Sequence, residues 1–268
     1  ITLAAIIVAI VLNTDAGLFR QPGSVDTDKE ATVATPVYDG DLVVYGMYPQ
    51  SEVSGNELTQ DIVDASYDSN HDAEVDGVMY RRIAFEDVTY PLVPWETEYR
   101  YFVYEPVKWR VLYNQDGQML LISDMILDCQ YYETEAGEFD WLSTDAYAWL
   151  NGEFKELAFT IDEQASIKAT SAGEIFLLSD TELGKYMLVT GEFDVEDVKV
   201  YTSDYASAMG VKPGIEEGDA NWYLRGEEAG AYTVYTGSSQ GLAVMSVIFH
   251  SKNEGVGIRP AIVLNVQP

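Results

Sequence analysis

Two aromatic residues and two arginines in the last third of the chain have side chains suited to ligand binding. Trp222 and Tyr223 stand beside Arg225 in NWYLRG, and Arg259 follows in GVGIRPAIVLN. A planar guanidinium can hold a carboxylate or phosphate through paired hydrogen bonds, and an aromatic ring can stack on a sugar. We therefore predict these four as ligand-binding residues.

The same residues also fit a purely structural role. In a chain with 45 acidic residues, an arginine flanked by apolar residues commonly satisfies an internal carboxylate or a backbone carbonyl. If Trp222 and Tyr223 alternate along a strand, only one of them faces outward. The alternative interpretation is that this cluster joins the C-terminal strands to a helical layer.

Acidic side chains also gather in DSNHDAEVDG, which begins at Asp68 and resembles a calcium-binding loop. Its sixth position is Ala73 instead of glycine, and its twelfth is Met79 instead of the bidentate glutamate. These departures favour a solvated approach to a hairpin. We predict no metal ligands and no cofactor, with a weaker Ca²⁺ site built from separate loops as the alternative.

Carboxylate pairs that could serve acid–base catalysis are common at this acidity, for example Glu96 with Glu98 and Asp194 with Glu196. Catalysis requires a defined separation and a shifted pKa, and spacing alone gives neither. The chain has no G-x-S-x-G, H-E-x-x-H or phosphate-binding loop. No catalytic residue is predicted.

The two histidines and the one cysteine do not form a recognisable site. His71 and His250 are too far apart in sequence to indicate a metal pair. Cys129 lies among apolar residues in LLISDMILDCQYY, which favours a small buried residue over a nucleophile.

The charge of the chain excludes one class of partner. The formal net charge is −30, from 45 acidic and 15 basic residues, and the longest basic run is Arg81-Arg82. Nucleic-acid binding requires a cationic stripe that displaces counterions from phosphates. The remaining partner classes are a small molecule, a glycan or a protein.

The N-terminal residues differ in composition from the rest. Residues 1–12, ITLAAIIVAIVL, are apolar except for Thr2. They are too few to cross a bilayer but suit the apolar part of a signal peptide or membrane anchor. Residues 13–37 are predicted as a linker and 38–268 as a single domain. An exported, cell-surface or membrane-tethered protein is expected.

Local patterns in the body predict both strands and helices. Asp76-Gly77 and Asp116-Gly117 each match a hairpin turn between β-type runs. Apolar spacing predicts one helix within 54–65, capped by Ser54 or Asn56, and another within 143–159, capped by Ser143 or Thr144. Two capping boxes, TIDE at 160–163 and SDTE at 179–182, begin further helices, and strands are expected near 223, 232–235, 242–249 and 258–264.

Seven short segments occur in an order that resembles a family of bacterial surface and secreted proteins with a domain of unknown function. They are YGMYPQSEV, EPVKWRVL, LLISDMILDCQYY, AYAWLNGEFKELAF, EIFLLSDTE, WYLRG and GVGIRPAIVLN. The family's second tryptophan is Tyr223 here, and its Ser-Pro is Gly226-Glu227. The chain ending is also similar to C-type-lectin-like and formylglycine-generating-enzyme-like folds, although the reactive cysteines of the latter enzymes are missing.

Together these observations predict an α+β fold with a twisted, mostly antiparallel sheet, a few short helices and a C-type-lectin-like arrangement. The leading functional hypothesis is a non-catalytic module at the cell surface with a binding or structural role. The alternatives are a carboxylate-dependent glycan hydrolase and a lectin-like module that binds carbohydrate with the help of Ca²⁺.

Overall fold

The structure is a computed structural model of the chain. The predicted signal or anchor segment 1–12 lies outside the described residues, as does all of the predicted linker except residue 37. The described residues are 37–39, 42–134, 140–187, 200–213, 220–226, 231–238, 241–247 and 255–266.

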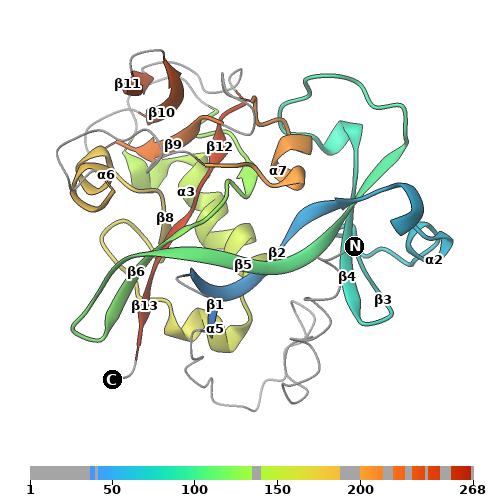
Figure 1. The fold of residues 1–268 in the computed structure, drawn as a ribbon, viewed down its shortest axis with the longest axis horizontal. Helices are drawn as coiled ribbons and strands as arrows, with labels where there is room; N and C mark the ends of the chain where they lie inside the picture. Colours follow the sequence, from blue (N-terminus) through green and yellow to red (C-terminus); the bar gives the residue numbers. More distant parts are fainter. Residues whose placement is uncertain are drawn as a thin grey trace.

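The larger of two sheets has the long strand β5 at its centre (Figure 1). The strand order is β1-β2-β5-β6-β13-β8, and β4 pairs with β5 on one side and β3 on the other. All pairings in this sheet are antiparallel. Its strands are β1 (Val37–Asp39), β2 (Leu42–Val53), β3 (Asp72–Val75), β4 (Val78–Ala84), β5 (Tyr99–Gln115), β6 (Gln118–Ser123), β8 (Ile175–Phe176) and β13 (Ala261–Asn265).

Two hairpins of this sheet confirm the turn predictions. Asp76 and Gly77 join β3 to β4, and Asp116 and Gly117 join β5 to β6. All four have positive φ, between 53° and 79°. Two-residue turns of type I′ need this conformation at both positions, and Asp-Gly adopts it readily. The short Asp-Gly segments therefore fix the register of both strand pairs.

The smaller sheet lies at the top of Figure 1 and has the order β11-β10-β9-β12-β7. Only β12 and β9 run parallel, so the prediction of an α+β fold with mostly antiparallel strands is confirmed. Its strands are β7 (Asp128–Cys129), β9 (Trp222–Arg225), β10 (Ala231–Ser238), β11 (Gly241–Val247) and β12 (Gly257–Ile258).

The predicted strand at 258–264 is in fact two strands that serve different sheets. β12 ends at Ile258 in the smaller sheet, and β13 starts at Ala261 in the larger one. Arg259 and Pro260 separate them, and proline has no N–H to continue a ladder of hydrogen bonds. This crossing connects the two sheets through one short segment.

The helical segment predicted at 143–159 is confirmed, with an irregularity in its middle. It consists of α3 (Asp145–Trp149), the π-helical turn η4 (Leu150–Phe154) and α4 (Lys155–Ala158). Thr144 is the N-cap, because its side chain accepts a hydrogen bond from the backbone N–H of Tyr147. The π-helical turn was not predicted.

Both capping boxes are confirmed, at the starts of α5 (Ile161–Ser166) and α6 (Asp180–Tyr186). The helix predicted within 54–65 is much shorter than expected, and Thr59 caps it instead of Ser54 or Asn56. Ile62 is its one buried side chain, so little apolar burial supports further turns. The remaining elements are α2 (Gln60–Val63), α7 (Asp204–Ala208) and the 3₁₀ turns η1 (Gly55–Glu57), η2 (Phe85–Asp87) and η3 (Trp141–Ser143).

A single cluster of buried apolar side chains includes residues from both sheets and from the helical segments. Trp109 of β5 is fully buried in it, and its indole N–H donates to the carbonyl of Tyr45 at 2.8 Å. Among the described residues, no helix is long and apolar enough to cross a membrane.

Candidate functional site

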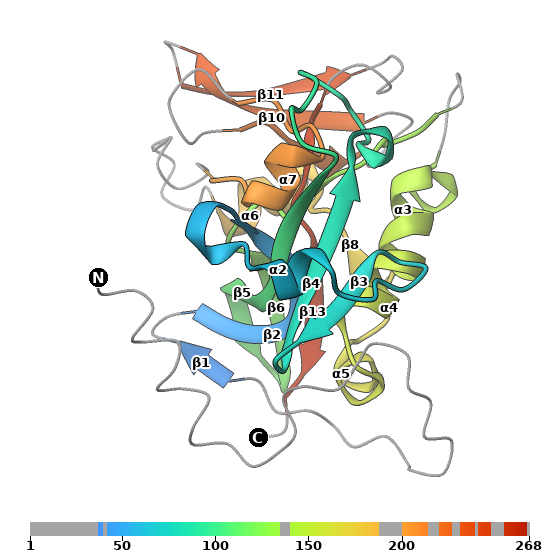
Figure 2. The same cartoon turned by 90° about the vertical axis from the view of Figure 1, so that its right-hand side faces the viewer.

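A polar cavity of about 690 Å³ lies where β4, β7, η4, α4 and α7 approach one another. In Figure 2, β4 runs between α7 on its left and the α3–α4 segment on its right. The volume lies within the range of typical small-molecule sites. The polar residues that line it are Tyr48, Ser69, Asn70, His71, Arg81, Arg82, Asp87, Thr89, Asp128, Gln130, Glu153, Glu156 and Tyr205.

Asp128, the first residue of β7, is a buried acid in the cavity wall. It accepts hydrogen bonds from the Tyr48 hydroxyl and from the backbone N–H of Cys129, the latter at 2.6 Å. Burial raises the pKa of Asp128 from 3.8 to about 7, although the hydrogen bonds and Arg81 lower it. A substantial fraction of this carboxyl group therefore carries a proton at neutral pH.

Arg81 and Asp72 form a buried ion pair across the β3–β4 hairpin. The guanidinium donates from Nε and Nη2 to the two carboxylate oxygens, both at 2.8 Å. Burial lowers the pKa of Arg81, but Tyr205 and the hydrogen bond to Asp72 raise it, and it ends well above its ordinary value. The charge of Arg81 is thus already balanced by a carboxylate.

The outer edge of the cavity contains a histidine in an unusual backbone conformation. His71 has φ of 64°, and its carbonyl accepts a hydrogen bond from the Arg82 N–H at 2.9 Å. Its Nδ1 atom lies 3.5 Å from Oδ2 of Asp87. Positive φ is uncommon for residues other than glycine, although asparagine, aspartate and histidine adopt it more often than most, and such conformations cluster at functional sites.

The opposite wall is formed by the π-helical turn η4 and by α4. Gly152 and Glu153 lie within η4, and Glu156 lies one turn further on. π-Helical turns are rare, and those found inside α-helices are frequently at functional sites. A Cβ atom added at Gly152 would have no atom within 4 Å. This wall therefore has free space and two exposed carboxylates.

The predicted ligand-binding residues lie elsewhere, in and beside β9. Trp222 and Tyr223 are 0% and 1% exposed. The expected alternation of one inward and one outward ring is not found, because β9 lies inside the smaller sheet and is covered on both faces by the core cluster. Tyr223 packs against Tyr132 with ring centroids 5.3 Å apart.

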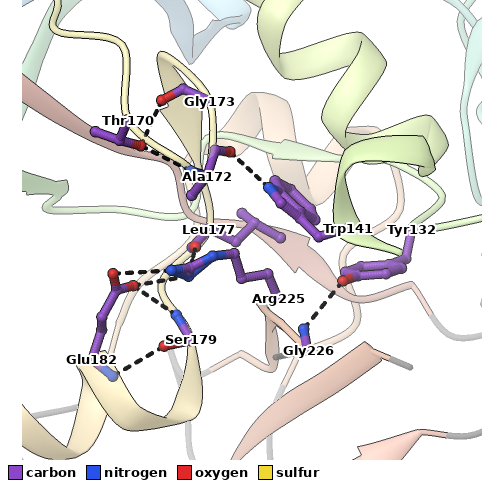
Figure 3. Close-up of polar contacts among 10 residues, drawn as sticks. All are labelled: Tyr132, Trp141, Thr170, Ala172, Gly173, Leu177, Ser179, Glu182, Arg225 and Gly226. Atoms are coloured by element: carbon purple, nitrogen blue, oxygen red, sulfur yellow. Dashed lines mark hydrogen bonds and ion pairs between the residues drawn. The ribbon is translucent and has the colours of Figure 1, made fainter. Parts of the chain in front are cut away.

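Arg225, at the end of β9, connects the sheet to α6. Figure 3 shows its guanidinium directed at Glu182, with contacts of 2.9 and 3.0 Å to the two carboxylate oxygens. The same carboxylate accepts from the backbone N–H of Ser179 in the capping box. The structural interpretation of Arg225, a link from the C-terminal strands to the helices, is confirmed.

Arg259, between β12 and β13, is 1% exposed. Its Nε donates to the carbonyl of Ser123 at 2.9 Å, and its guanidinium lies 4.9 Å from the centroid of the Trp222 ring. Nη1 of Arg259 and the indole nitrogen of Trp222 are buried without a hydrogen-bond partner. Burial, together with the smaller effect of the charge of Arg110, lowers the pKa of Arg259 to about 9.

Three of the four predicted ligand-binding residues thus have no exposed surface to offer. Arg225 retains a side-chain exposure of 14%. The network in Figure 3 also holds this region together through Tyr132, whose hydroxyl accepts from the N–H of Gly226 at 3.4 Å, and Trp141, whose indole donates to the Ala172 carbonyl at 2.7 Å. Ligand binding by these residues remains a prediction.

In the segment that resembles a calcium-binding loop, two aspartates form hydrogen bonds and an ion pair within the protein. One oxygen of Asp68 accepts from the backbone N–H groups of Asn70 and Asp72, and Asp72 itself pairs with Arg81. Within the described ranges, no group of three or more histidine, cysteine, aspartate or glutamate side chains is placed to hold a metal ion. Ca²⁺ binding remains a prediction.

The other predicted features have mixed outcomes. Cys129 is 2% exposed, and burial raises the pKa of its thiol, which confirms the interpretation as a small buried residue. Glu96 and Glu98 are exposed. Asp194, Glu196 and His250 lie outside the described residues.

Sequence reasoning missed the cavity, although one pattern pointed to it. Asp128 is a charged residue inside the apolar run MILDC, and an acid in such a position is buried and has a raised pKa. Tyr48 and Arg81 come from distant parts of the chain, so only the fold brings them to Asp128. The π-helical turn has no recognised sequence pattern.

The described part of the chain is an α+β fold with a large polar cavity. The chain belongs to the family described as Domain of unknown function (DUF6273), which matches residues 116–266. No curated protein and no solved structure matches the chain. The cavity combines Asp128, Gly152 and Tyr205 from the matched region with Tyr48 and Arg81, which precede it.

Proposed function

We propose that this protein is a binding module that holds a small polar ligand in the cavity around Asp128. The cavity itself carries the proposal, because its volume fits a small molecule and its walls present a mixture of hydroxyl, amide, imidazole and carboxyl groups. A shifted pKa, a π-helical turn and a histidine with positive φ occur together at its walls.

The cellular setting is part of the same proposal. The apolar run at 1–12 and the net charge of −30 support an exported or membrane-tethered module at the cell surface. Neither feature identifies the ligand. A C-type-lectin-like function with Ca²⁺ would require metal ligands in addition to the cavity groups.

The test is a thermal-shift screen of the full chain against monosaccharides, polyols, amino acids and polyamines. We expect at least one compound to raise the melting temperature, since a ligand that binds only the folded state stabilises it. The variant Gly152→Leu, whose side chain enters free space at the cavity wall, should abolish the shift.

Gly184→Leu is the matched control. Gly184 is also a helical glycine whose added Cβ meets no atom within 4 Å, but it lies in α6, away from the cavity. The control should retain the shift. If no compound stabilises the wild-type chain, or if Gly152→Leu responds as Gly184→Leu does, the proposed function is wrong.

A hydrolase is the second candidate, because a protonated carboxyl and a neighbouring carboxylate share the cavity. Asp128 has a pKa of about 7, and the charge of Glu153 contributes to its rise. These are the groups that acid-assisted hydrolysis of a glycosidic bond requires. Turnover of a glycan panel that is lost in Asp128→Asn would support this candidate. Turnover that persists in that variant would exclude Asp128 as the acid.

A further inference from the structure

We infer that the ligand of the cavity is an organic cation, with a protonated amine held by Glu153 and Glu156. This inference rests on the proposed function and names the chemical class that the site accepts. It follows from an account of every charged group in the cavity wall, and of which charges are already balanced inside the protein.

Of the two arginines of the wall, Arg81 is balanced by a carboxylate, whereas the Nε of Arg82 is buried without a hydrogen-bond partner. Arg81 forms two hydrogen bonds with Asp72, so this pair has no net charge to offer. Arg82 lies between two rings, with its guanidinium 4.4 Å from the centroid of Tyr67 and 4.5 Å from that of Tyr99. Arg82 therefore contributes one positive charge to the wall, against the two negative charges of Glu153 and Glu156.

The two carboxylates in the wall formed by η4 and α4, Glu153 and Glu156, are not balanced by any partner within the protein's described residues. Across the part of the chain that the structure describes, Glu153 and Glu156 form neither a hydrogen bond nor an ion pair. They are three residues apart, near the end of η4 and the start of α4. Both line the cavity.

The remaining titratable groups do not reverse this balance. Asp87 is 3.5 Å from His71, which at most cancels its charge when the imidazole is protonated. Asp128 is neutral when protonated and negative otherwise. Tyr48 and Tyr205 are buried phenols, and burial raises the pKa of both hydroxyl groups. The cavity thus carries a net negative charge of local origin.

The position of the site and its preference for a ligand charge depend on different residues. The concave site is defined by the cavity and by Asp128, Tyr48 and Arg81 at its inner wall. Glu153 and Glu156 determine which ligand charge is accepted there. A charge-assisted hydrogen bond from an ammonium to a carboxylate is about twice as strong as a neutral one, so the preference should be measurable.

Three probes with the same four-carbon chain test the inference: putrescine, 1,4-butanediol and succinate. They carry two positive charges, none and two negative charges at neutral pH. In calorimetric titrations of the full chain, we expect putrescine to bind at least about tenfold more tightly than 1,4-butanediol, which corresponds to 1.4 kcal/mol. Succinate should not bind.

The double variant Glu153→Gln and Glu156→Gln should remove this preference while leaving the cavity shape unchanged. A matched control is Glu96→Gln with Glu98→Gln, which changes the net charge equally at exposed positions away from the cavity. The control should retain the preference. It separates local recognition from general attraction of cations by an acidic protein.

The outcomes distinguish this inference from the proposed function. If 1,4-butanediol or succinate binds as tightly as putrescine and Gly152→Leu abolishes binding, the site is right and the charge inference is wrong. If none of the three probes binds, or if the Glu96/Glu98 control loses the preference as well, the charge inference is also wrong. Putrescine binding that Gly152→Leu leaves unchanged contradicts both.

Discussion

The cavity wall and the β9 region each contain a buried arginine, but the two guanidinium groups have different partners and opposite pKa shifts. Arg81 has a bidentate carboxylate partner and a raised pKa, whereas Arg259 has one carbonyl, an indole ring and a lowered pKa. The first arrangement lines an open volume, and the second fills a closed one. The difference shows that an aromatic–arginine cluster such as Trp222 with Arg259 can serve core packing. An arginine in a salt bridge, such as Arg81, can instead line a candidate ligand site.

The largest expected effect comes from Asp72→Asn, which leaves the Arg81 charge buried without its partner. Removing one member of a buried ion pair costs about 3–5 kcal/mol, because the other charge is then uncompensated. Urea denaturation followed by circular dichroism measures the free energy of unfolding. A loss below about 1 kcal/mol would mean that solvent in the cavity already satisfies Arg81.

The next effect is a dependence of stability on pH that originates from Asp128. Its folded pKa of about 7 exceeds the ordinary 3.8, so between these values the folded state binds more protons than the unfolded state. The free energy of unfolding contributed by Asp128 therefore decreases as the pH rises through this range, by roughly 4 kcal/mol at most.

The variant Asp128→Asn keeps the shape of the side chain and removes its titration. Relative to wild type, it should become more stable as the pH increases from about 4 to 7, the range that the two pKa values define. Urea denaturation at several pH values gives this difference. Parallel curves for the two proteins would show that Asp128 titrates in the folded state as it does in the unfolded chain.

A smaller effect is expected at the Arg225–Glu182 pair of the β9 region. Its side chains are 14% and 29% exposed, so solvent weakens their attraction. A double-mutant cycle with Arg225→Gln and Glu182→Gln should give a coupling energy of about 1 kcal/mol. A coupling as large as the cost of Asp72→Asn would remove the contrast between the two regions.

The smallest change is expected at Arg259, despite its complete burial. Arg259→Met removes a charge that has no carboxylate partner within the described ranges, so the relief from desolvation offsets the lost hydrogen bond to Ser123. The free energy of unfolding should change by less than about 1 kcal/mol. A loss of several kcal/mol would instead assign Arg259 a major role in joining the two sheets.

Local sequence patterns predicted much of the fold, because they act over a few residues. The Asp-Gly turns at 76–77 and 116–117 and the two capping boxes depend only on backbone conformation and neighbouring side chains. The same reasoning failed for the helix within 54–65, whose length depends on how much apolar surface it can bury.

The cavity could not be predicted in this way, because its parts meet only in the folded chain. Tyr48 and Asp128 are 80 residues apart. The β9 cluster attracted the functional prediction because its residue types are concentrated in sequence, yet Trp222 and Tyr223 are buried because β9 lies inside the smaller sheet and packs into the core cluster. Long-range strand pairing decides both outcomes.

The central claim, that the ligand binds in the cavity and not at β9, is tested most directly by the compound panel applied to two variants in parallel. These are Gly152→Leu in the cavity wall and Arg225→Gln at β9. The account predicts that Gly152→Leu abolishes the thermal shift of a stabilising compound and that Arg225→Gln preserves it. The reverse result, a shift kept in Gly152→Leu and lost in Arg225→Gln, would contradict the account and place the site at β9.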